Sequence, residues 1–252
     1  MAIPKLALIP SGVKAGKLYS VLPTNGDGDF TTTRNTVGTR VNENGLIEEV
    51  ASNVPRLDYS DGGCPSLLLE PTATNPVTYS GDFDNTAWTK SNSSVVSGFV
   101  SPSGDTSAFK LTEDTSNSTH RISDVVLVPA SGVVYTQSIF AKSGGNGRFL
   151  RMFRGSGTYN FAVFDLDNGT VFSQGGSNII STKIEEYPNG WYRCSSTFTT
   201  QFSNIAIYYS LQNGNSDSYT GDGTSGLYIY GAQLEQNSYA TSYIKTVGTT
   251  QT

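Results

Sequence analysis

Hydrophobic and polar residues alternate with a period of two in many segments of this chain, and the segment 204–211 shows the pattern most clearly. One set of alternating positions is apolar and consists of Ile205, Ile207, Tyr209 and Leu211. The positions between them are smaller or more polar and consist of Asn204, Ala206, Tyr208 and Ser210. Successive side chains of a strand point to opposite faces of a sheet. The pattern therefore predicts a sandwich strand with one face in the core and the other toward solvent.

From about residue 77 onward, segments of this kind follow one another at regular spacing, with Gly, Asn and Asp turns between them. We expect strands at residues 95–100, 107–113, 120–128, 133–142, 149–153, 159–165, 170–172, 179–186, 191–198, 204–211 and 226–234. Sustained helical periodicity is absent from the sequence, although residues 80–88 suit a short helical turn. Many short strands at this spacing predict an all-β jelly-roll β-sandwich.

Residues 1–76 differ from the rest because prolines and turn signals interrupt only short strand-like pieces. These pieces cover residues 17–22, 29–34, 39–41, 46–50 and 66–69. Asn44-Gly45 joins two of them and predicts a hairpin with a tight primed turn. The segment has little apolar mass for a core of its own. We therefore predict a small irregular β region at 1–76 that is stabilised by packing on other subunits or on a larger assembly, followed by the jelly-roll domain at 77–252.

Composition and charge narrow the function. Charged residues make up only 15 % of the chain and the formal net charge is -5, which disfavours a nucleic-acid partner. Arg148, Arg151 and Arg154 form a basic cluster that suits solvated strand edges better than a phosphate site. The sequence offers no apolar run long enough for membrane insertion and no secretory signal, so we expect a protein released by cell lysis, as a virion component is.

Cofactors and metals are not expected. The chain has a single His, His120, and its two cysteines, Cys64 and Cys194, are 130 residues apart, which is unlike a zinc site. Buried thiols suit these cysteines, and a disulfide between them is the alternative that the sequence leaves open.

Several motifs occur in a characteristic order. They are Phe83-Asp84-Asn85 with Trp88-Thr89-Lys90, Ser101-Pro102-Ser103-Gly104-Asp105-Thr106, Ala108-Phe109-Lys110-Leu111-Thr112-Glu113, Tyr187-Pro188-Asn189-Gly190-Trp191-Tyr192-Arg193, and Gly231-Ala232-Gln233-Leu234-Glu235 with Ser242-Tyr243-Ile244. Upstream stand Thr39-Arg40-Val41-Asn42, Gly45-Leu46-Ile47-Glu48, Pro55-Arg56-Leu57-Asp58-Tyr59 and Leu67-Leu68-Leu69-Glu70-Pro71 with Thr74-Asn75. In this order the chain resembles bacteriophage head-spike and fibre virion proteins with a carbohydrate-binding-module-like jelly-roll domain.

This resemblance implies a jelly roll on the surface of the phage particle, an N-terminal part that attaches or trimerises, and glycan binding. The implied partners are other virion proteins of the capsid or tail, two further copies of the chain in a homotrimer, and a cell-surface glycan. Related sugar-binding modules often hold calcium with an acidic residue of the final strand. Tyr230-Gly231-Ala232 has no carboxylate at that place, so we expect no calcium site.

Glycan binding requires aromatic faces for the C–H surface of a sugar and planar polar groups for its hydroxyls. The aromatic candidates are Trp88, Tyr159, Tyr208 and Tyr228. The polar candidates are His120, Arg121, Gln137 and Arg151. The structural alternative places Trp88 as a lid over the core edge and gives His120 and Arg121 ordinary surface roles, while Trp191, Tyr192 and Phe198 suit the core.

Catalysis is not expected. Glycan hydrolysis needs two carboxylates facing one cleft. Adjacent pairs such as Glu185-Glu186 point to opposite faces of a strand. Asp165 and Asp167 share a face but flank a turn, so turn chemistry explains them better. Asp217 and Asp222 suit a solvated loop better than a cation site.

The sequence therefore predicts a non-enzymatic structural protein of the virion surface, as a head fibre, spike or capsid decoration, with weak multivalent glycan binding. The alternative is a tail-fibre adhesin that binds the receptor, and a glycan depolymerase ranks below both.

Overall fold

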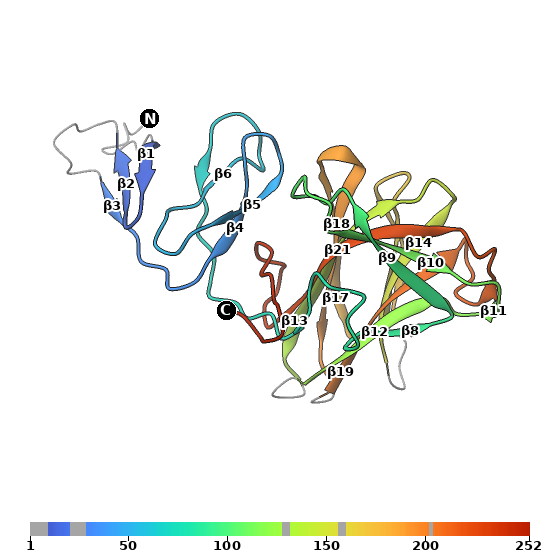
Figure 1. Cartoon of the computed structure of the whole chain (residues 1–252). Coiled ribbons are helices and arrows are strands. Elements are labelled where there is room, and N and C mark those ends of the chain that lie inside the picture. Colours follow the sequence, from blue (N-terminus) through green and yellow to red (C-terminus); the bar gives the residue numbers. More distant parts are fainter. Residues whose placement is uncertain (1–9, 21–28, 128–131, 156–159, 202–203) are drawn as a thin grey trace, which may run out of the picture. The chain divides into compact units, whose positions relative to one another are not determined.

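The structure, a computed structural model, describes residues 10–20, 29–127, 132–155, 160–201 and 204–252. The chain forms two compact units, residues 1–71 and residues 72–252 (Figure 1). This division falls five residues before the boundary that composition indicates. The assignment of the first unit to attachment stays a prediction.

The first unit is built from short antiparallel strands. A three-stranded sheet contains β1 (Pro10–Lys14), β2 (Lys17–Ser20) and β3 (Phe30–Thr31). Two two-stranded sheets pair β4 (Gly38–Val41) with β5 (Ile47–Val50) and β6 (Leu57–Asp58) with β7 (Ser66–Leu67). Sequence alternation anticipated five of these strands, while β1 and β6 were missed because they are short and carry few apolar residues.

The hairpin predicted at Asn44-Gly45 is present, but its turn is not the primed type. Asn42 and Leu46 form the last backbone hydrogen bond of the hairpin, with a distance of 2.9 Å from the Asn42 N to the Leu46 O. The side-chain Oδ1 of Asn42 also accepts hydrogen bonds from the backbone N–H groups of Asn44 and Leu46. Gly45 has a positive φ of 76°, whereas Asn44 does not. A three-residue loop ending in a left-handed glycine therefore replaces the two-residue turn, because the Asn42 side chain organises the loop.

Polar groups supply much of the order of the first unit. Its buried apolar side chains among the described residues are Leu18, Val41, Ile47, Val50 and Pro55. The Arg34 guanidinium donates hydrogen bonds to the carbonyl oxygens of Thr36, Val50, Ala51 and Val54. One arginine thus ties the segment before β4 to the end of β5 and the turn that follows it.

The second unit is a sandwich of two six-stranded antiparallel sheets (Figure 1). The β13 sheet has the order β17 (Ile179–Tyr187), β18 (Trp191–Thr199), β13 (Val134–Ser143), β21 (Gly226–Glu235), β10 (Ala108–Glu113) and β9 (Ser93–Phe99). The β14 sheet has the order β16 (Thr170–Gly175), β15 (Asn160–Asp165), β14 (Arg148–Gly155), β19 (Asn204–Asn213), β12 (Arg121–Leu127) and β8 (Thr89–Ser91). The chain crosses repeatedly between the sheets, as in a jelly roll.

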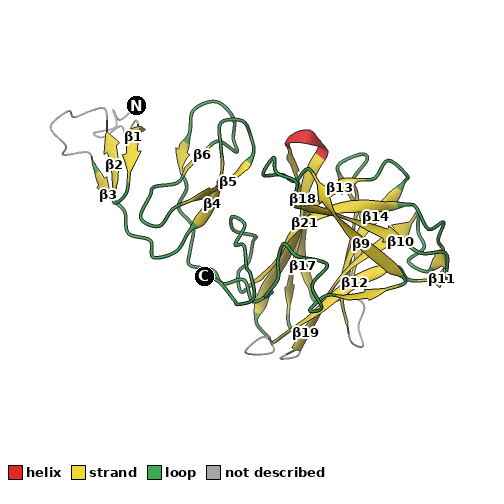
Figure 2. Ribbon diagram, viewed as in Figure 1, coloured by secondary structure: helices red, strands yellow, loops and turns green. Residues whose placement is uncertain are grey.

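The predicted all-β jelly-roll class is confirmed, and each of the eleven strands expected after residue 77 is present within a few residues of its expected bounds. The short strands β8, β11 (Asn117–Ser118) and β20 (Tyr219–Thr220) were not anticipated, because their two or three residues carry little alternation. Residues 83–88 form two successive turns instead of a helix. The only helix in the described chain is the 3-10 turn at Pro188–Gly190, drawn red in Figure 2. Among the residues that the structure describes, no helix has the length and apolar character to cross a bilayer.

The core between the two sheets follows the alternation of the sequence. Ile205, Ile207, Tyr209 and Leu211 of β19 all point into it, as predicted. From β14 the core receives Leu150 and Met152, both fully buried. Each large apolar side chain removed from water in this way contributes about 1.5–3 kcal/mol to folding. Because alternate residues of β14 and β19 enter the core, the residues between them must lie on the outer face of the β14 sheet.

The C-terminal segment covers the centre of the outer face of the β13 sheet. Tyr243 is 3 % exposed and packs against Phe140 and Tyr230, with ring centroids 6.2 and 5.4 Å away. Gly231 has a positive φ of 65°, and a Cβ there would meet the Tyr243 ring at 3.1 Å. The motif from Gly231 to Tyr243 thus closes the chain over its own sheet, which leaves the two sheets of the sandwich different at their outer faces.

Candidate functional site

The outer face of the β14 sheet carries a row of three aromatic residues on adjacent strands. The strand register aligns Tyr208 of β19 with Phe153 of β14, and Phe153 with Phe161 of β15. The rings of Tyr208 and Phe153 stack with centroids 4.3 Å apart and an angle of 4° between their planes. Next in the row is Gly175 of β16, where a Cβ would stand 2.7 Å from a Phe161 ring carbon. Glycine at 175 therefore allows the Phe161 ring to lie close over the neighbouring strand.

A second row, one step along the strands, carries two arginines. Arg121 of β12 aligns with Ser210 of β19, and Ser210 aligns with Arg151 of β14. Both guanidinium groups lie over the aromatic row. The Cζ of Arg121 is 4.8 Å from the Tyr208 ring centroid, and the Cζ of Arg151 is 4.6 Å from the Phe161 centroid. These distances fall within the range of cation–π contacts. We call the set Arg121, Arg151, Phe153, Phe161 and Tyr208 the aromatic–arginine face.

A small residue, Ser210, stands between the two arginines and is 1 % exposed. Its single hydroxyl hydrogen is within reach of two backbone carbonyl oxygens, that of His120 at 3.1 Å and that of Leu211 at 3.2 Å. The hydrogen-bonding capacity of the serine is therefore directed to the backbone, and the larger side chains around it form the surface. Arg121, Phe153, Phe161 and Tyr208 are each partly exposed, so rings and one guanidinium group meet solvent together.

The two arginines of the face differ in their electrostatic environment. Arg151 is 9 % exposed and its Nη1 lies 2.5 Å from an Asp217 carboxylate oxygen. Asp217 is on the loop that follows β19. Among the described residues, Arg121 has neither a carboxylate partner nor a hydrogen-bond acceptor for its guanidinium group, and its Nε is enclosed without a partner. One positive charge of the face is thus neutralised and the other is not.

Of the eight predicted site residues, the structure brings three together. Tyr208, Arg121 and Arg151 all belong to the aromatic–arginine face. Phe153 and Phe161 were missed as site residues. Their alternation with Met152 and Ala162 places them on the outer face, but only the register between β14, β15 and β19 aligns them with Tyr208.

Three predicted site residues are enclosed, which corrects their assignment to a sugar-contacting surface. Trp88 is 1 % exposed, and its ring lies 5.1 Å from Phe83 and 5.9 Å from Tyr209, inside the core rather than as a lid. Gln137 is fully buried because the alternation of β13 directs it between the sheets with Ile139. His120 is also fully buried.

The two remaining candidates do not join the face. Tyr228 of β21 is partly exposed on the outer face of the β13 sheet, where it packs 4.9 Å from Phe99. Tyr159 lies outside the described residues.

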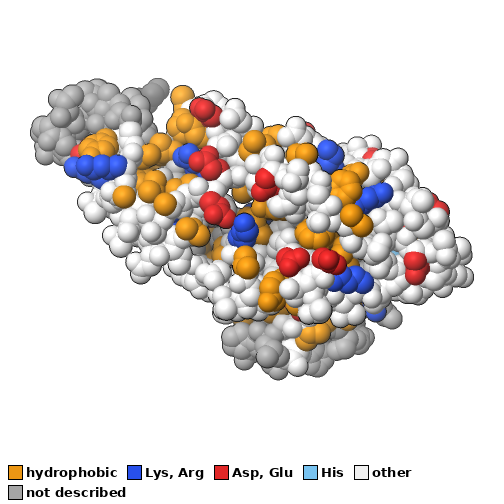
Figure 3. All heavy atoms as spheres, in the orientation of Figure 1, with side chains coloured by type: hydrophobic (Ala, Val, Ile, Leu, Met, Phe, Trp, Pro, Cys, Tyr) orange, Lys and Arg blue, Asp and Glu red, His pale blue; other side chains and the backbone are white. Residues whose placement is uncertain are grey.

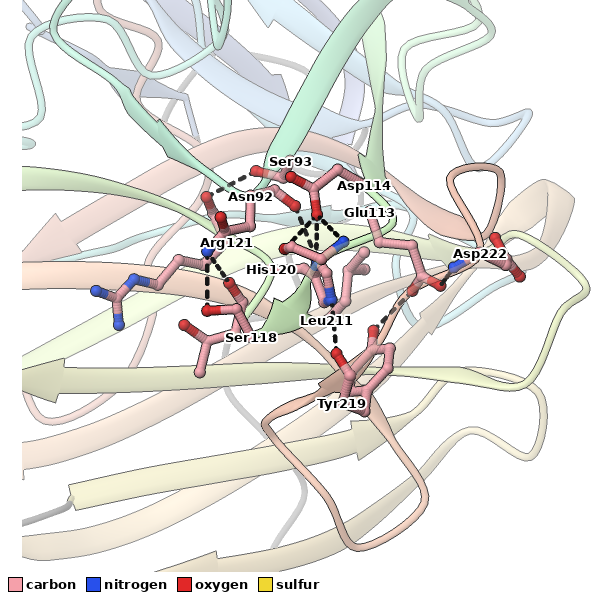
Figure 4. A network of polar contacts seen from close by, with 12 residues as sticks. Asn92, Ser93, Glu113, Asp114, Ser118, His120, Arg121, Leu211, Tyr219 and Asp222 are labelled. Atoms are coloured by element: carbon pink, nitrogen blue, oxygen red, sulfur yellow. Dashed lines mark hydrogen bonds and ion pairs between the residues drawn. The ribbon is translucent and has the colours of Figure 1, made fainter.

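His120 belongs to a network of polar contacts at one end of the sandwich (Figure 4). Its Nδ1 is 2.7 Å from the Asn92 carbonyl oxygen and 3.4 Å from an Asp114 carboxylate oxygen, and its Nε2 is 3.2 Å from the Tyr219 carbonyl oxygen. The ring therefore ties together segments that are distant in the sequence. This is a structural role, and it replaces the surface and glycan-contact roles considered for His120.

Glu113 is the most enclosed carboxylate of this network. Arg148 donates to both of its oxygens at 2.7 and 2.8 Å, Tyr219 donates its hydroxyl at 2.7 Å, and the backbone N–H of Asp222 donates at 2.9 Å. Burial alone would raise the pKa of Glu113, but these hydrogen bonds outweigh it and hold the pKa below its usual value. Burial and the bond to Glu113 raise the pKa of Tyr219. Arg148 thus serves as a half-buried structural partner, not as a solvated strand edge.

The acidic residues weighed for catalysis or cation binding have other partners. Asp165 accepts the backbone N–H groups of Asp167 and Asn168, which confirms turn chemistry. Asp222 accepts from the hydroxyl and backbone N–H groups of Thr224 and Ser225, and the Ser225 hydroxyl contributes most to lowering the pKa of Asp222. Within the described ranges no three His, Cys, Asp or Glu side chains gather as a metal-binding group.

Cys64 and Cys194 are both free thiols. Cys194 is buried among the core residues, and burial raises the pKa of its thiol well above the usual value. Cys64 is exposed in the first unit, which corrects the expectation that both thiols are buried.

Comparisons with known proteins find likeness in structure only. No protein-family model matches the chain, and no curated protein matches it. The enzymatically active domain of tailspike protein 4 from bacteriophage CBA120 matches with a TM-score of 0.38 and 14% identity, over 64% of this chain and 21% of that chain. TmCBM61, solved in complex with beta-1,4-galactotriose, matches with a TM-score of 0.40 and 13% identity, over 65% of this chain and 99% of that chain.

The CBM22-1 xylan-binding domain of Xyn10C from Paenibacillus barcinonensis matches with a TM-score of 0.38 and 12% identity, over 67% of this chain and 95% of that chain. The chain thus spans about a fifth of the tailspike chain and nearly the whole of both modules.

Proposed function

We propose that the second unit binds saccharides through the aromatic–arginine face. The observation that carries this proposal is the row of Tyr208, Phe153 and Phe161, partly exposed on adjacent strands beside two guanidinium groups. The rings offer apolar surface for the C–H groups of a sugar. The guanidinium groups and the Tyr208 hydroxyl offer hydrogen bonds for its oxygen atoms. The rigid sheet presents these groups at fixed spacing.

One feature of the fold favours this face over the other. The C-terminal segment covers the centre of the outer face of the β13 sheet, where Tyr243 lies. The side of the molecule seen in Figure 3 shows charged side chains of both signs scattered among uncharged atoms. A surface with mixed charges provides little long-range electrostatic attraction for a ligand, so short-range contacts at the binding site determine which ligand binds.

The setting that we propose for this binding comes from the sequence resemblance. The chain is a surface protein of a phage particle, as a head fibre, spike or capsid decoration, with the first unit attaching it or joining three copies. Each face contacts a glycan of the host or of its surroundings weakly. Several copies on one particle then raise the overall affinity, because the second contact forms at a high effective concentration. The reaction is reversible binding without bond cleavage.

Binding of the full-length protein to a multivalent array of bacterial surface glycans tests the proposal. Tyr208→Ala is the test variant and Tyr228→Ala is its matched control. Both tyrosines lie on inner strands of a sheet, both are partly exposed, and each packs against one phenylalanine. We expect the wild type and Tyr228→Ala to bind the same saccharides, and Tyr208→Ala to bind them at least about tenfold more weakly, which corresponds to about 1.4 kcal/mol.

Two results would contradict the proposal. One is the absence of binding to every saccharide of the array by the wild type. The other is an equal loss for both variants while their tryptophan fluorescence shows that both stay folded.

A further inference from the structure

Arg121 differs from every other arginine whose side chain the structure describes. Each of the others donates to an acceptor of the protein: Arg34 to four carbonyl oxygens, Arg40 to Leu57 and Glu48, Arg56 to Thr39 and Glu70, Arg148 to Glu113, Arg151 to Asp217, and Arg193 to Ser138. Arg121 donates to none of the described residues. Its Nε is enclosed without a partner, a feature that it shares with Arg40 and Arg193. A guanidinium group offers five N–H donors, and leaving enclosed donors unmatched costs free energy.

The surroundings of Arg121 hold the guanidinium group in place without neutralising it. Its Cζ lies 4.8 Å from the Tyr208 ring centroid and 5.6 Å from the Phe153 centroid. Contact with two rings restricts the side chain and removes part of its hydration. Binding of an anion to Arg121 therefore costs less free energy than binding to a freely moving arginine, because the side chain has less freedom and less hydration to lose.

The nearby carboxylates are directed elsewhere. In Figure 4 the guanidinium group of Arg121 extends away from the side of the network where Glu113, Asp114 and Asp222 lie. Asp124 is three residues further along β12 and therefore points to the opposite face of the sheet. Among the described residues, the one carboxylate with a contact on the face, Asp217, is paired with Arg151. The face consequently holds two arginines and one aspartate, a local excess of one positive charge.

We propose that the aromatic–arginine face selects saccharides that carry a carboxylate, such as uronic acids, and that Arg121 binds this carboxylate. The proposal rests on the saccharide binding proposed above and names the class of sugar. A planar carboxylate matches the fork of a guanidinium group and accepts two parallel hydrogen bonds. The sugar ring attached to the carboxylate then lies beside Tyr208 and Phe153. The net charge of the chain, -5, acts against a polyanion at long range. At physiological salt this repulsion is screened beyond about 8 Å, so the local contact dominates.

The experiment compares polygalacturonate with its ester, which differ in one group, and with a sulfated galactan, whose backbone differs as well. Polygalacturonate carries carboxylates, its fully methyl-esterified form carries none, and a sulfated galactan carries another anion. Affinities are measured with full-length protein on each immobilised polymer. The variants are Arg121→Gln, which removes the charge, and Arg121→Lys, which keeps the charge without the fork. Lys183→Gln is the control, because it removes one exposed positive charge from β17 of the other sheet.

We expect the wild type to bind polygalacturonate at least about tenfold more tightly than the ester, as hydrogen bonds to charged groups predict. Arg121→Gln should abolish this preference and leave the weak binding to the ester unchanged. Arg121→Lys should retain only part of the preference, and Lys183→Gln all of it.

The outcomes separate this proposal from the one on which it rests. Equal binding of the acid and the ester by the wild type would overturn the carboxylate selectivity and leave saccharide binding intact. Tighter binding to the sulfated galactan, with Arg121→Lys equal to the wild type, would also overturn it, because charge alone would then explain the attraction. An equal loss of the preference for polygalacturonate in Lys183→Gln and Arg121→Gln would show that Arg121 has no specific role in it. The absence of binding to all three polymers and to the glycan array would refute saccharide binding itself.

Discussion

Replacing Glu113 with glutamine tests how far the second unit depends on an ionised carboxylate in its interior. The carboxylate is 1 % exposed and accepts four hydrogen bonds, two from Arg148, one from the Tyr219 hydroxyl and one from the Asp222 backbone. Glutamine has nearly the same shape but offers one oxygen in place of two. Its amide nitrogen then faces an N–H group of Arg148, and two donors oppose each other.

The expected loss follows from these contacts. Removing one partner of a buried ion pair costs about 3–5 kcal/mol, since the other charge is left enclosed. Asp222 lies 3.6 Å from the Arg148 Nη2 and still balances part of its charge, so the lower end, about 3 kcal/mol, applies. For a unit of this size, 1 kcal/mol shifts the melting temperature by about 2–4 °C. We therefore expect a melting temperature lower by roughly 6–12 °C.

Urea unfolding followed by tryptophan fluorescence measures this loss directly. The two tryptophans of the chain, Trp88 and Trp191, both belong to the second unit and both are 1 % exposed, so the signal reports that unit alone. Glu185→Gln is the control, because Glu185 forms an exposed pair with Lys183, and such pairs contribute less than about 1 kcal/mol. A free energy of unfolding for Glu113→Gln within 0.5 kcal/mol of this control, roughly the spread of neutral surface substitutions, would refute the reasoning.

Two further predictions concern titration and thiol reactivity. The folded-state pKa of Glu113 lies below its unfolded value of about 4.3. The ionised carboxylate therefore contributes its full stabilisation above that pH and loses it as the pH falls toward the folded-state pKa. Urea midpoints between pH 7 and 3 should fall less steeply for Glu113→Gln than for the wild type, and parallel curves would contradict this prediction. Cys64 is exposed, whereas Cys194 is buried and its thiol has a raised pKa. A thiol reagent should therefore modify Cys64 in the folded protein and both cysteines in denaturant. Mass spectrometry identifies the modified site, and rapid modification of Cys194 in the folded protein would contradict the structure.

The sequence by itself determined the eleven longer strands of the second unit and the faces of β19, but not the short strands β8, β11 and β20. Alternation is a local property, and a strand of eight residues contains the whole signal that sends Ile207 and Tyr209 inward and Tyr208 outward. Turn chemistry is equally local, which is why Asp165 was correctly placed in a turn. The two-residue primed turn at Asn44-Gly45 was wrong because the Asn42 side chain adds a hydrogen-bonded loop that the dipeptide alone does not reveal.

Only the tertiary structure decided which outward residues form a site. Trp88 has the composition of a sugar platform, but Phe83 and Tyr209 enclose it in the core. Tyr208 and Tyr228 have the same local pattern, yet they lie on different sheets. The neutralisation of Arg151 depends on Asp217, which is 66 residues away in the sequence. Strand order, register and loop path bring such residues together, and these depend on the packing of the whole sandwich. For this reason the strands follow from the sequence, whereas the unpartnered charge of Arg121 appears only in the folded chain.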